Sequence, residues 1–236
     1  MKRPFTKNAV IVAALVAAAG CRGEDPLTVA PESLTLHYGE KEMITTNAGR
    51  PVFSSEDDYH ATVDAYGLVT AGKVGSTVIR VSAENGNAEV PVTVEPEYSL
   101  YPDIDRLIGA TMDEVSSVFG PGHNSAPSSG GGTMWGYTNW NRYASVAFLF
   151  EGGRVTYALV VVPTTYTQSL ASHLKERYTV AGMLDDYFFL LNRDMSVIIS
   201  LTVYSSTRLS VLYDRYDGTK SPSREVIPSF DGLFDW

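Results

Sequence analysis

The sequence predicts an all-β sandwich followed by an α+β domain built on an antiparallel sheet. Up to about residue 96, short runs of alternating apolar and polar residues are separated by turn residues, which is typical of a β-sandwich. From residue 101 onward, apolar residues at helical spacing occur twice, and each time alternating runs follow. Between the two patterns lies Val94-Glu95-Pro96-Glu97, where charge and proline indicate a domain boundary.

The first twenty residues predict a secretory signal peptide. Lys2, Arg3 and Lys7 give a basic start, and the eleven apolar residues of 9–19 follow. That apolar run is too short to span a bilayer, which needs about 20 residues.

Ala18-Ala19-Gly20-Cys21 resembles a bacterial lipobox. The resemblance implies that Cys21 becomes an N-terminus acylated with fatty acids such as palmitate, which would anchor the chain in a membrane. Residues 21–26 are then an anchor linker. The alternative is an ordinary secretory signal that ends near a cysteine, but Cys21 is the only cysteine, and a leftover free thiol is unusual on an exported protein.

Arg22-Gly23-Glu24-Asp25 resembles the surface-export signal of lipoproteins from Bacteroidetes-type bacteria. Together with the lipobox, it implies an outer-membrane lipoprotein of a Gram-negative bacterium. Whether the protein faces the cell surface or the periplasm stays open.

Composition excludes some partners and favours packed cores. The formal charge is −9, and removal of the three basic residues in the signal segment leaves −12. This acidity, without a basic cluster, disfavours nucleic acid and anionic membrane surfaces as partners. The hydrophobic fraction of 44%, with 14 Tyr and 9 Phe, is ample for two globular cores.

Residues 27–96 predict the sandwich, and its clearest element is a hairpin over 77–94. Alternating residues of 77–83 lead into Asn85-Gly86, which predicts a two-residue turn. Pro91 lacks an N–H, so the returning strand is expected at an edge or with that position pointing outward. Asp64-Ala65-Tyr66-Gly67 predicts a second turn, with Gly67 in the left-handed region.

These residues resemble a bacterial immunoglobulin-like domain of group 2. The resemblance rests on a series of short segments that occur in the family's order: Val29–Leu36, Gly39-Glu40, Phe53–Ser55, Ala61–Asp64, Gly67–Ala71, Gly75–Ile79 and Val90–Val94. It implies a sandwich that serves surface proteins and adhesins as a spacer or binding module, and it implies no catalysis.

Residues 101–216 predict two helix-plus-three-strand units. Thr111-Met112-Asp113-Glu114 is a capping box that starts a helix, which Gly120-Pro121 ends. A Gly/Ser/Pro-rich loop over 121–133 follows. Strands are predicted at about 134–138, 144–151 and 154–162, a second helix at 166–178, and strands at 187–191, 196–204 and 208–216.

A sequence match supports duplication of this unit. Asn141–Val146 aligns with Asn192–Val197, 51 residues further on. Alternation predicts that helices cover one apolar face of the sheet, which is expected to include Val146, Phe148, Phe150, Val155, Tyr157, Leu159 and Val161. The opposite face is expected to be open and lined by small residues.

The segment from Ile104 to Val162 carries a second, weaker resemblance. Ile108–Thr111, Phe119-Gly120-Pro121 and Trp135-Gly136-Tyr137 are similar to modules of small barrel-assembly lipoproteins and β-lactamase-inhibitor-like proteins. The second unit lacks the Gly-x-Thr and Phe-Gly-Pro elements. The resemblance implies a protein-binding sheet without enzyme activity.

The sequence offers no catalytic, cofactor or metal motif. It lacks a His-Glu-x-x-His pair, a Gly-x-Ser-x-Gly elbow and a phosphate loop. The four histidines share no ligand spacing, and the acidic pairs Asp57-Asp58 and Asp185-Asp186 are typical of solvated turns.

Four aromatic residues form the candidate ligand-binding cluster: Trp135, Tyr137, Trp140 and Tyr143. Trp140 lies between Asn139 and Asn141, and an exposed aromatic beside amides suits sugar stacking or a protein hot spot. In the alternative, Trp135 and Tyr137 cap the core and Trp140 covers the end of the hairpin.

Residues 217–236 are a tail whose apolar residues, Phe230, Leu233, Phe234 and Trp236, follow a polar stretch. Such a tail docks on its own domain or, if free, exposes an apolar patch to a partner.

The sequence thus predicts a non-enzymatic envelope lipoprotein that acts as an adhesion or binding module for a protein or glycan. The alternative is a structural or assembly component of an outer-membrane complex.

Overall fold

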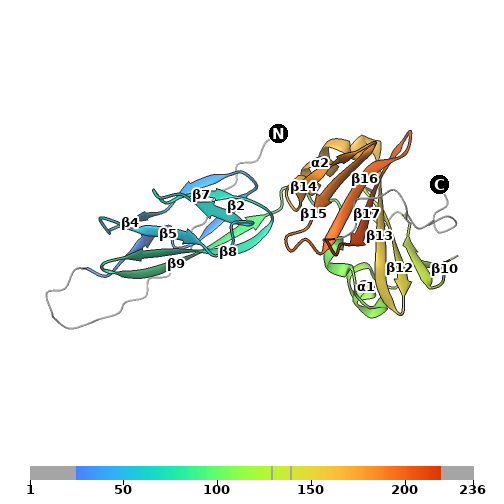
Figure 1. The fold of residues 1–236 in the computed structure, drawn as a ribbon, viewed down its shortest axis with the longest axis horizontal. Helices are drawn as coiled ribbons and strands as arrows, with labels where there is room; N and C mark the ends of the chain where they lie inside the picture. Colours follow the sequence, from blue (N-terminus) through green and yellow to red (C-terminus); the bar gives the residue numbers. More distant parts are fainter. Residues whose placement is uncertain (1–24, 129, 139, 219–236) are drawn as a thin grey trace.

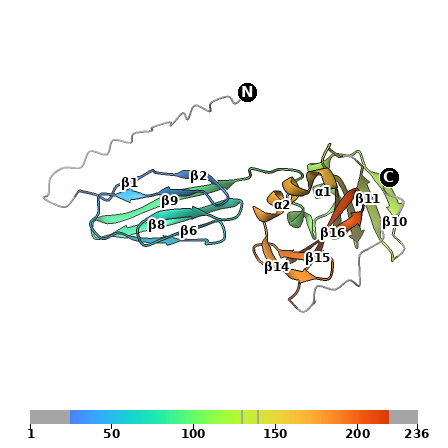
Figure 2. The same ribbon diagram turned by 90° about the horizontal axis from the view of Figure 1, so that it is seen from above.

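The computed structural model describes residues 25–128, 130–138 and 140–218, which form two parts placed end to end (Figures 1 and 2). The predicted signal peptide and Cys21 lie outside the described residues, as does the tail from residue 219 onward. Within the described residues, no helix is long and apolar enough to cross a membrane.

The first part is a β-sandwich. Its main sheet has the strand order β2-β9-β8-β5, a second sheet has the order β3-β7-β6, and β1 pairs with β4. Eleven buried apolar residues fill the space between the sheets, Ile44 and Ile79 among them. The strands are β1 Val29–Ala30, β2 Leu34–His37, β3 Lys41–Met43, β4 Thr45–Thr46, β5 Val52–Ser55, β6 Ala61–Val63, β7 Leu68–Ala71, β8 Gly75–Ala83 and β9 Gly86–Glu95.

The predicted hairpin is confirmed as β8–β9, but its turn lies one residue earlier than expected. Ala83 pairs with Gly86, so the two turn residues are Glu84 and Asn85. Strand β9 is internal, and its parallel pairing with β2 begins only at Val92. Pro91 is exposed, as the outward-pointing alternative requires, and the edge alternative is wrong.

The predicted left-handed turn at Gly67 is also confirmed. The φ of Gly67 is 88°, and a Cβ there would lie 2.5 Å from the carbonyl oxygen of Ile44. Only glycine fits this position, because both the backbone conformation and the space exclude a side chain.

The second part is one eight-stranded antiparallel sheet with the order β10-β11-β12-β13-β17-β16-β15-β14. Each helix is followed by four strands rather than the predicted three, and the last strands of the two units pair in the middle. The elements are η1 Ile104–Leu107, α1 Met112–Phe119, β10 Asn124–Pro127, β11 Thr133–Tyr137, β12 Ser145–Glu151, β13 Arg154–Pro163, η2 Thr164–Tyr166, α2 Thr167–Lys175, β14 Thr179–Leu184, β15 Tyr187–Leu191, β16 Val197–Ser205 and β17 Arg208–Arg215.

The two strands that the sequence did not predict, β10 and β14, are the two edges of this sheet. Their residues are mostly exposed and do not alternate between buried and exposed positions. Hydrophobic periodicity therefore carries no signal for them, because it arises only where one face of a strand is buried.

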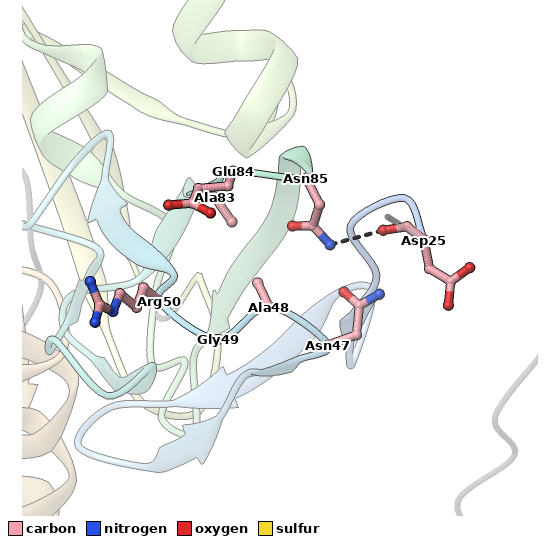
Figure 3. Close-up of a pocket in the computed structure, with 8 residues that line it drawn as sticks. All are labelled: Asp25, Asn47, Ala48, Gly49, Arg50, Ala83, Glu84 and Asn85. Carbon is pink, nitrogen blue, oxygen red and sulfur yellow. Dashed lines mark hydrogen bonds between the residues drawn. The ribbon is translucent and has the colours of Figure 1, made fainter. Parts of the chain in front are cut away.

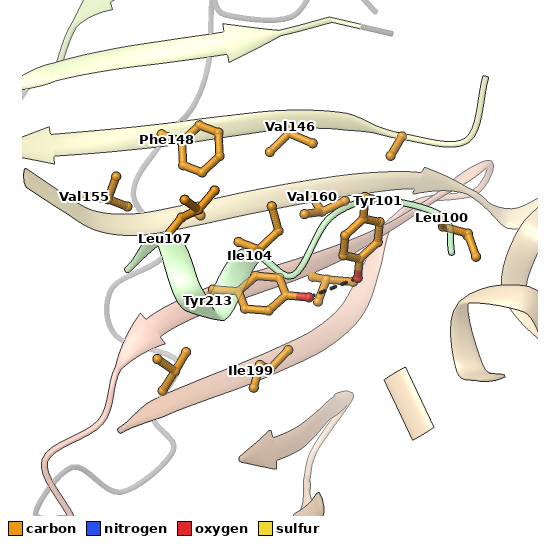
Figure 4. Close-up of a cluster of buried hydrophobic side chains, with 14 of the residues drawn as sticks. Leu100, Tyr101, Ile104, Leu107, Val146, Phe148, Val155, Val160, Ile199 and Tyr213 are labelled. Atoms are coloured by element: carbon orange, nitrogen blue, oxygen red, sulfur yellow. Dashed lines mark hydrogen bonds between the residues drawn. The ribbon is translucent and has the colours of Figure 1, made fainter. Parts of the chain in front are cut away.

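One face of the sheet packs against the helices. Figure 4 shows Ile104 and Leu107 of η1, preceded by Leu100 and Tyr101, facing strand residues that include Phe148. The hydroxyl groups of Tyr101 and Tyr213 lie 3.1 Å apart within this core. The predicted cover of helices on one face is thus present.

The residues on the two faces differ from the prediction because strand β13 contains a bulge. Phe150 pairs with Val155, but Leu149 pairs with Tyr157, so Thr156 is an extra residue. The Thr156 hydroxyl donates a hydrogen bond to the carbonyl oxygen of Leu149 at 3.3 Å. One inserted residue reverses the alternation that follows it.

As a result, Ala158, Val160 and Val162 face the helices, whereas Tyr157, Leu159 and Val161 point to the opposite face. The prediction that Tyr157, Leu159 and Val161 share a face with Phe148 is therefore wrong. The opposite face is also neither open nor lined only by small residues, since Leu149, Leu159 and Val161 are buried there.

The two parts meet where α2 ends. Three backbone carbonyls at this helix end, those of Lys175, Glu176 and Arg177, accept hydrogen bonds from loops of the sandwich. The donors are Lys73 Nζ at 2.6 Å, the Val74 N–H at 2.8 Å and the Tyr59 hydroxyl at 2.6 Å. The carbonyls that every helix leaves unpaired at its C-terminus are here satisfied across the junction.

Side chains reinforce the same junction. Arg193 pairs with Asp57 of the sandwich at 2.7 Å. The carboxylate of Glu176 accepts the N–H groups of Glu97 and Tyr98 in the linker, both at 3.2 Å. The linker is therefore tied to α2 along its length.

Candidate binding site

The four aromatic residues predicted as a ligand platform lie along β11 and the connection that follows it. Tyr137 is only 2% exposed, and Trp135, Trp140 and Tyr143 are half-buried. An exposed platform that includes Tyr137 is therefore wrong. Whether the other three rings are available to a ligand depends on the contacts that they make within the domain.

Trp135 and Tyr137 hold the end of α1 to the sheet. The ring of Trp135 stacks on His123, with centroids 3.8 Å apart. The Tyr137 hydroxyl donates a hydrogen bond to the carbonyl oxygen of Gly120 at 3.0 Å, directly after α1. Both contacts favour the packing alternative over a binding surface.

Trp140 and Tyr143 are also engaged within the domain. Trp140 packs edge-on against Phe119 with centroids 5.1 Å apart, and Tyr143 meets Tyr166 at the same distance. The amide of Asn141 donates to the carbonyl oxygen of Leu100 at 2.8 Å and accepts from the backbone of residues 143 and 144. Asn139, the other predicted amide, lies outside the described residues.

A groove of about 390 Å³ lies at the junction of the two parts, but its charged groups are already paired. Arg177 Nε donates to Asp103 at 2.8 Å, and the Tyr178 hydroxyl donates to Asp105 at 2.8 Å. Burial raises the pKa of Asp105, and the hydrogen bond from Tyr178 opposes that rise. These pairs stabilise the junction, and they leave few charged or hydrogen-bonding groups available to a ligand.

A larger hollow of about 730 Å³ lies on the sandwich, between the loop 47–50 and the β8–β9 turn (Figure 3). The Asn85 amide, which points into it, donates to the backbone oxygen of Asp25 at 2.9 Å. The Asn47 amide likewise donates to the carbonyl oxygen of Pro26 at 3.0 Å. These amides fasten the start of the described chain to the sandwich, so the hollow is structural.

Neither groove brings catalytic groups together. The histidines, whose spacing in the sequence already argued against a shared site, lie in separate parts of the fold: His37 and His60 in the sandwich, His123 beside Trp135 and His173 in α2. Within the described ranges, no group of three His, Cys, Asp or Glu side chains is arranged to hold a metal ion.

The surface that the sequence did not predict is the edge of the sheet at β14. Of the twelve large hydrophobic side chains that are exposed in the described part of the chain, six lie in β14–β16. We call four of these the β14 edge: Val180, Met183 and Leu184 of β14 and Phe188 of β15. Their exposed fractions are 58%, 70%, 54% and 40%.

The register shows how the β14 edge is organised. Met183 pairs with Phe188, which pairs with Leu201 on β16, so these three form one cross-strand row on the face that carries the helices. Leu201 packs against the core on this face, whereas Phe188 and Met183 toward the edge are 40% and 70% exposed. Strand β14 contains no charged residue, and no strand pairs with its outer side in the described structure.

The opposite edge of the same sheet differs in kind. Strand β10 has the sequence Asn-Ser-Ala-Pro, and polar side chains and proline protect an edge against pairing with another chain. The open, apolar edge at β14 therefore stands out within one sheet. The feature of the sequence that could have indicated this edge is the uncharged stretch Thr179–Leu184, which lacks the periodicity of a buried element.

Comparisons with known proteins bear on the sandwich. Residues 26–94 match the family model of the bacterial Ig-like domain (group 2), which confirms the resemblance found in the sequence. The match ends at Val94, so it covers less than half of the chain. No curated protein matches the chain.

Seven chains of known structure match. A mutant intimin from EHEC O157:H7 is 17% identical, with a TM-score of 0.26, over 56% of this chain and 90% of that chain. Domains 5–6 of the S-layer protein SbsC are 13% identical, with a TM-score of 0.26, over 84% of this chain and 86% of that chain.

Proposed function

We propose that the chain is a non-enzymatic binding module of the bacterial cell envelope, in which the Ig-like domain is a stalk and the eight-stranded sheet binds a protein partner. The observation that carries this proposal is the β14 edge. Unpaired strand edges with exposed apolar side chains are templates for pairing with another chain, and folded proteins normally protect them.

The geometry favours addition of a strand from the partner. An extended segment beside β14 would take up its outward backbone groups, and alternate side chains of that segment would rest on the row of Met183, Phe188 and Leu201. A protein partner fits this surface better than a glycan, because sugar recognition needs polar groups beside the aromatic ring.

Two features support the envelope location. The Ig-like domain at 26–94 belongs to a class found in surface proteins and adhesins, and the segment 1–21 has the form of a lipoprotein signal. Under this proposal Cys21 carries acyl chains that hold the protein in the outer membrane.

The anchor is tested with Cys21→Ser. Wild-type protein should fractionate with membranes and incorporate labelled palmitate, whereas the variant should lose the label and leave the membrane fraction. An unchanged distribution of the variant would contradict lipidation at Cys21.

The binding surface is tested with the double variant Val180→Lys and Met183→Lys. Two charges on an exposed edge oppose strand addition without filling the core. The amount of each envelope protein that co-purifies with the wild-type chain should be at least about tenfold lower with the double variant. A tenfold decrease corresponds to about 1.4 kcal/mol of lost affinity.

Val52→Lys is the matched control, because Val52 is 67% exposed on strand β5 of the sandwich. It should enrich the same proteins as wild type. Equal enrichment by all three chains would refute the β14 edge as the binding surface. Loss only in Trp140→Ala would favour the aromatic cluster and a glycan ligand.

Orientation is tested by adding protease to intact cells and probing for residues 101–216. Digestion places the sheet outside the cell, where an adhesion role is expected. Protection would favour the alternative role as a structural component of an outer-membrane complex.

A further inference from the structure

The second face of the eight-stranded sheet, opposite the helices, is apolar and buried. Its central residues are between 0% and 8% exposed, and they come from four neighbouring strands, β11, β12, β13 and β17: Met134, Ala147, Leu149, Leu159, Val161 and Leu212. We call this cluster the second face.

No described element covers the second face. Every member of the cluster, including its half-buried neighbours Ala126 and Tyr157, lies on a strand of the sheet itself. The helices and η1 contribute to the cluster on the other face instead. A sheet does not shield its own face from water, so another part of the chain or a second molecule must do so.

Residues 219–236 are the candidate cover. The described chain begins beside the β8–β9 turn of the sandwich, where the Leu27 N–H donates to the Asn85 carbonyl oxygen, and most of the sequence before it is predicted to be removed with the signal peptide. By contrast, residue 219 follows β17 closely, since that strand ends at Arg215 in the middle of the sheet.

The chemistry of this segment suits an apolar face. Its first part is polar, and its last seven residues, Phe-Asp-Gly-Leu-Phe-Asp-Trp, contain four large apolar side chains. Phe230 lies twelve positions after Gly218 in the sequence, which allows about 40 Å of reach, whereas β11 lies three strands from β17, or about 15 Å.

The second face also offers room for large rings. Across the sheet, Leu212 aligns with Leu159, Ala147 and Gly136 in turn. Side-chain size falls along this row from leucine to glycine, so within the row the sheet surface is lowest at Ala147 and Gly136. Aromatic side chains are suited to fill such a depression, since each buries 150–250 Å² of surface in typical cores.

From these observations we infer that residues 219–236 dock on the second face and form a third layer of the domain. The segment is then a structural part of the domain and does not serve as a free adhesive tail. The inference is independent of the proposed function, because the β14 edge lies at the other end of the sheet.

The test is a triple variant of the full chain, Phe230→Ser, Phe234→Ser and Trp236→Ser. Its thermal midpoint should fall by about 10 °C or more, and the fluorescence of the apolar dye ANS should rise. Hydrogen exchange should accelerate in β12 and β13, and a synthetic peptide of residues 219–236 should reverse these changes.

The matched control is Thr219→Ala, Ser221→Ala and Ser223→Ala, which alters the polar part of the same segment and should behave as wild type. If the triple variant aggregates, Trp236→Ala alone should still give a smaller shift in midpoint and exchange. Unchanged midpoint, dye binding and exchange would overturn the inference. The inference would also be overturned if light scattering gave a dimeric mass for both wild type and the triple variant, because a second copy of the chain would then cover the second face.

Discussion

His173 of α2 connects the linker, through Tyr98, to the core of the second part. Its side chain is fully buried in α2, Nδ1 lies 3.2 Å from the carbonyl oxygen of Tyr98, and Nε2 has no hydrogen-bond partner among the described residues. Burial, and next the charge of Arg177, lowers the pKa of His173 to about 3, while the Tyr98 carbonyl and Asp103 oppose the shift. The imidazole is therefore neutral in the folded protein.

This predicts acid sensitivity below the ordinary histidine pKa. Between pH 6.5 and 3 the unfolded state binds a proton at His173 that the folded state does not, so stability falls as pH falls through this window. From pH 7.5 to pH 5 the loss should be about 2 kcal/mol of unfolding free energy.

Chemical denaturation at both pH values measures this loss, and His173→Phe is the comparison. The variant keeps an aromatic ring beside Tyr101 but cannot titrate, so it should start from a lower stability and lose about 2 kcal/mol less on acidification. The same pH dependence in both proteins would rule out His173 as its source.

Trp140 is the second residue with a direct test. Because its ring packs against Phe119, Trp140→Ala should lower the unfolding free energy by about 2 kcal/mol. Tyr66→Ala, at an 84% exposed position, should change it by less than about 0.5 kcal/mol. If the two variants were equally stable in urea, Trp140 would make no stabilising contact and would be a free surface residue.

At the scale of elements, the N-terminus of α1 is determined locally. The capping box predicted from the sequence is present: the Thr111 hydroxyl accepts the Glu114 N–H at 3.3 Å, and the Glu114 carboxylate accepts the Thr111 N–H at 2.7 Å. The hydrogen bonds from Thr111 lower the pKa of Glu114.

Thr111→Ala should therefore destabilise the protein by about 1 kcal/mol, since it removes the side-chain half of the box. Thr111→Ser keeps the hydroxyl and should remain within about 0.3 kcal/mol of wild type. Urea unfolding of the three proteins decides the point, and equal midpoints for Ala and Ser would show that the cap contributes nothing.

The sequence could predict the elements that neighbouring residues determine, but not those that depend on contacts between distant parts of the chain. The β8–β9 hairpin and the α1 cap depend on neighbouring residues, so both were predictable. The bulge at Thr156 and the edges β10 and β14 depend on which strands pair, and no local pattern records that. The buried state of Tyr137 likewise follows from the packing of α1 on β11, so the aromatic cluster looked more exposed than it is.

For the whole molecule, the important feature is the junction that joins stalk and sheet. The last carbonyls of α2 receive donors from the sandwich, and desolvation by burial raises the pKa of Tyr59, one of these donors, to about 12. A hydrogen-bonded junction of this kind transmits orientation, so the stalk determines where the β14 edge points.

The double variant Tyr59→Phe and Lys73→Met removes two of these donors and leaves the Val74 backbone contact. Calorimetry of wild type should show one cooperative transition, and the double variant should show two, as the parts begin to melt independently. Tyr66→Phe, on the exposed surface of the sandwich, is the control. A single transition in all three proteins would mean that other contacts carry the coupling.

The central claim, that the β14 edge binds another protein of the envelope, is tested most directly by photo-crosslinking in living cells. A photoreactive phenylalanine analogue is placed at Met183 and, as control, at Tyr66. The account predicts a discrete adduct with a different protein from position 183 and none from position 66. No adduct from position 183, or the same adduct from both positions, would contradict it.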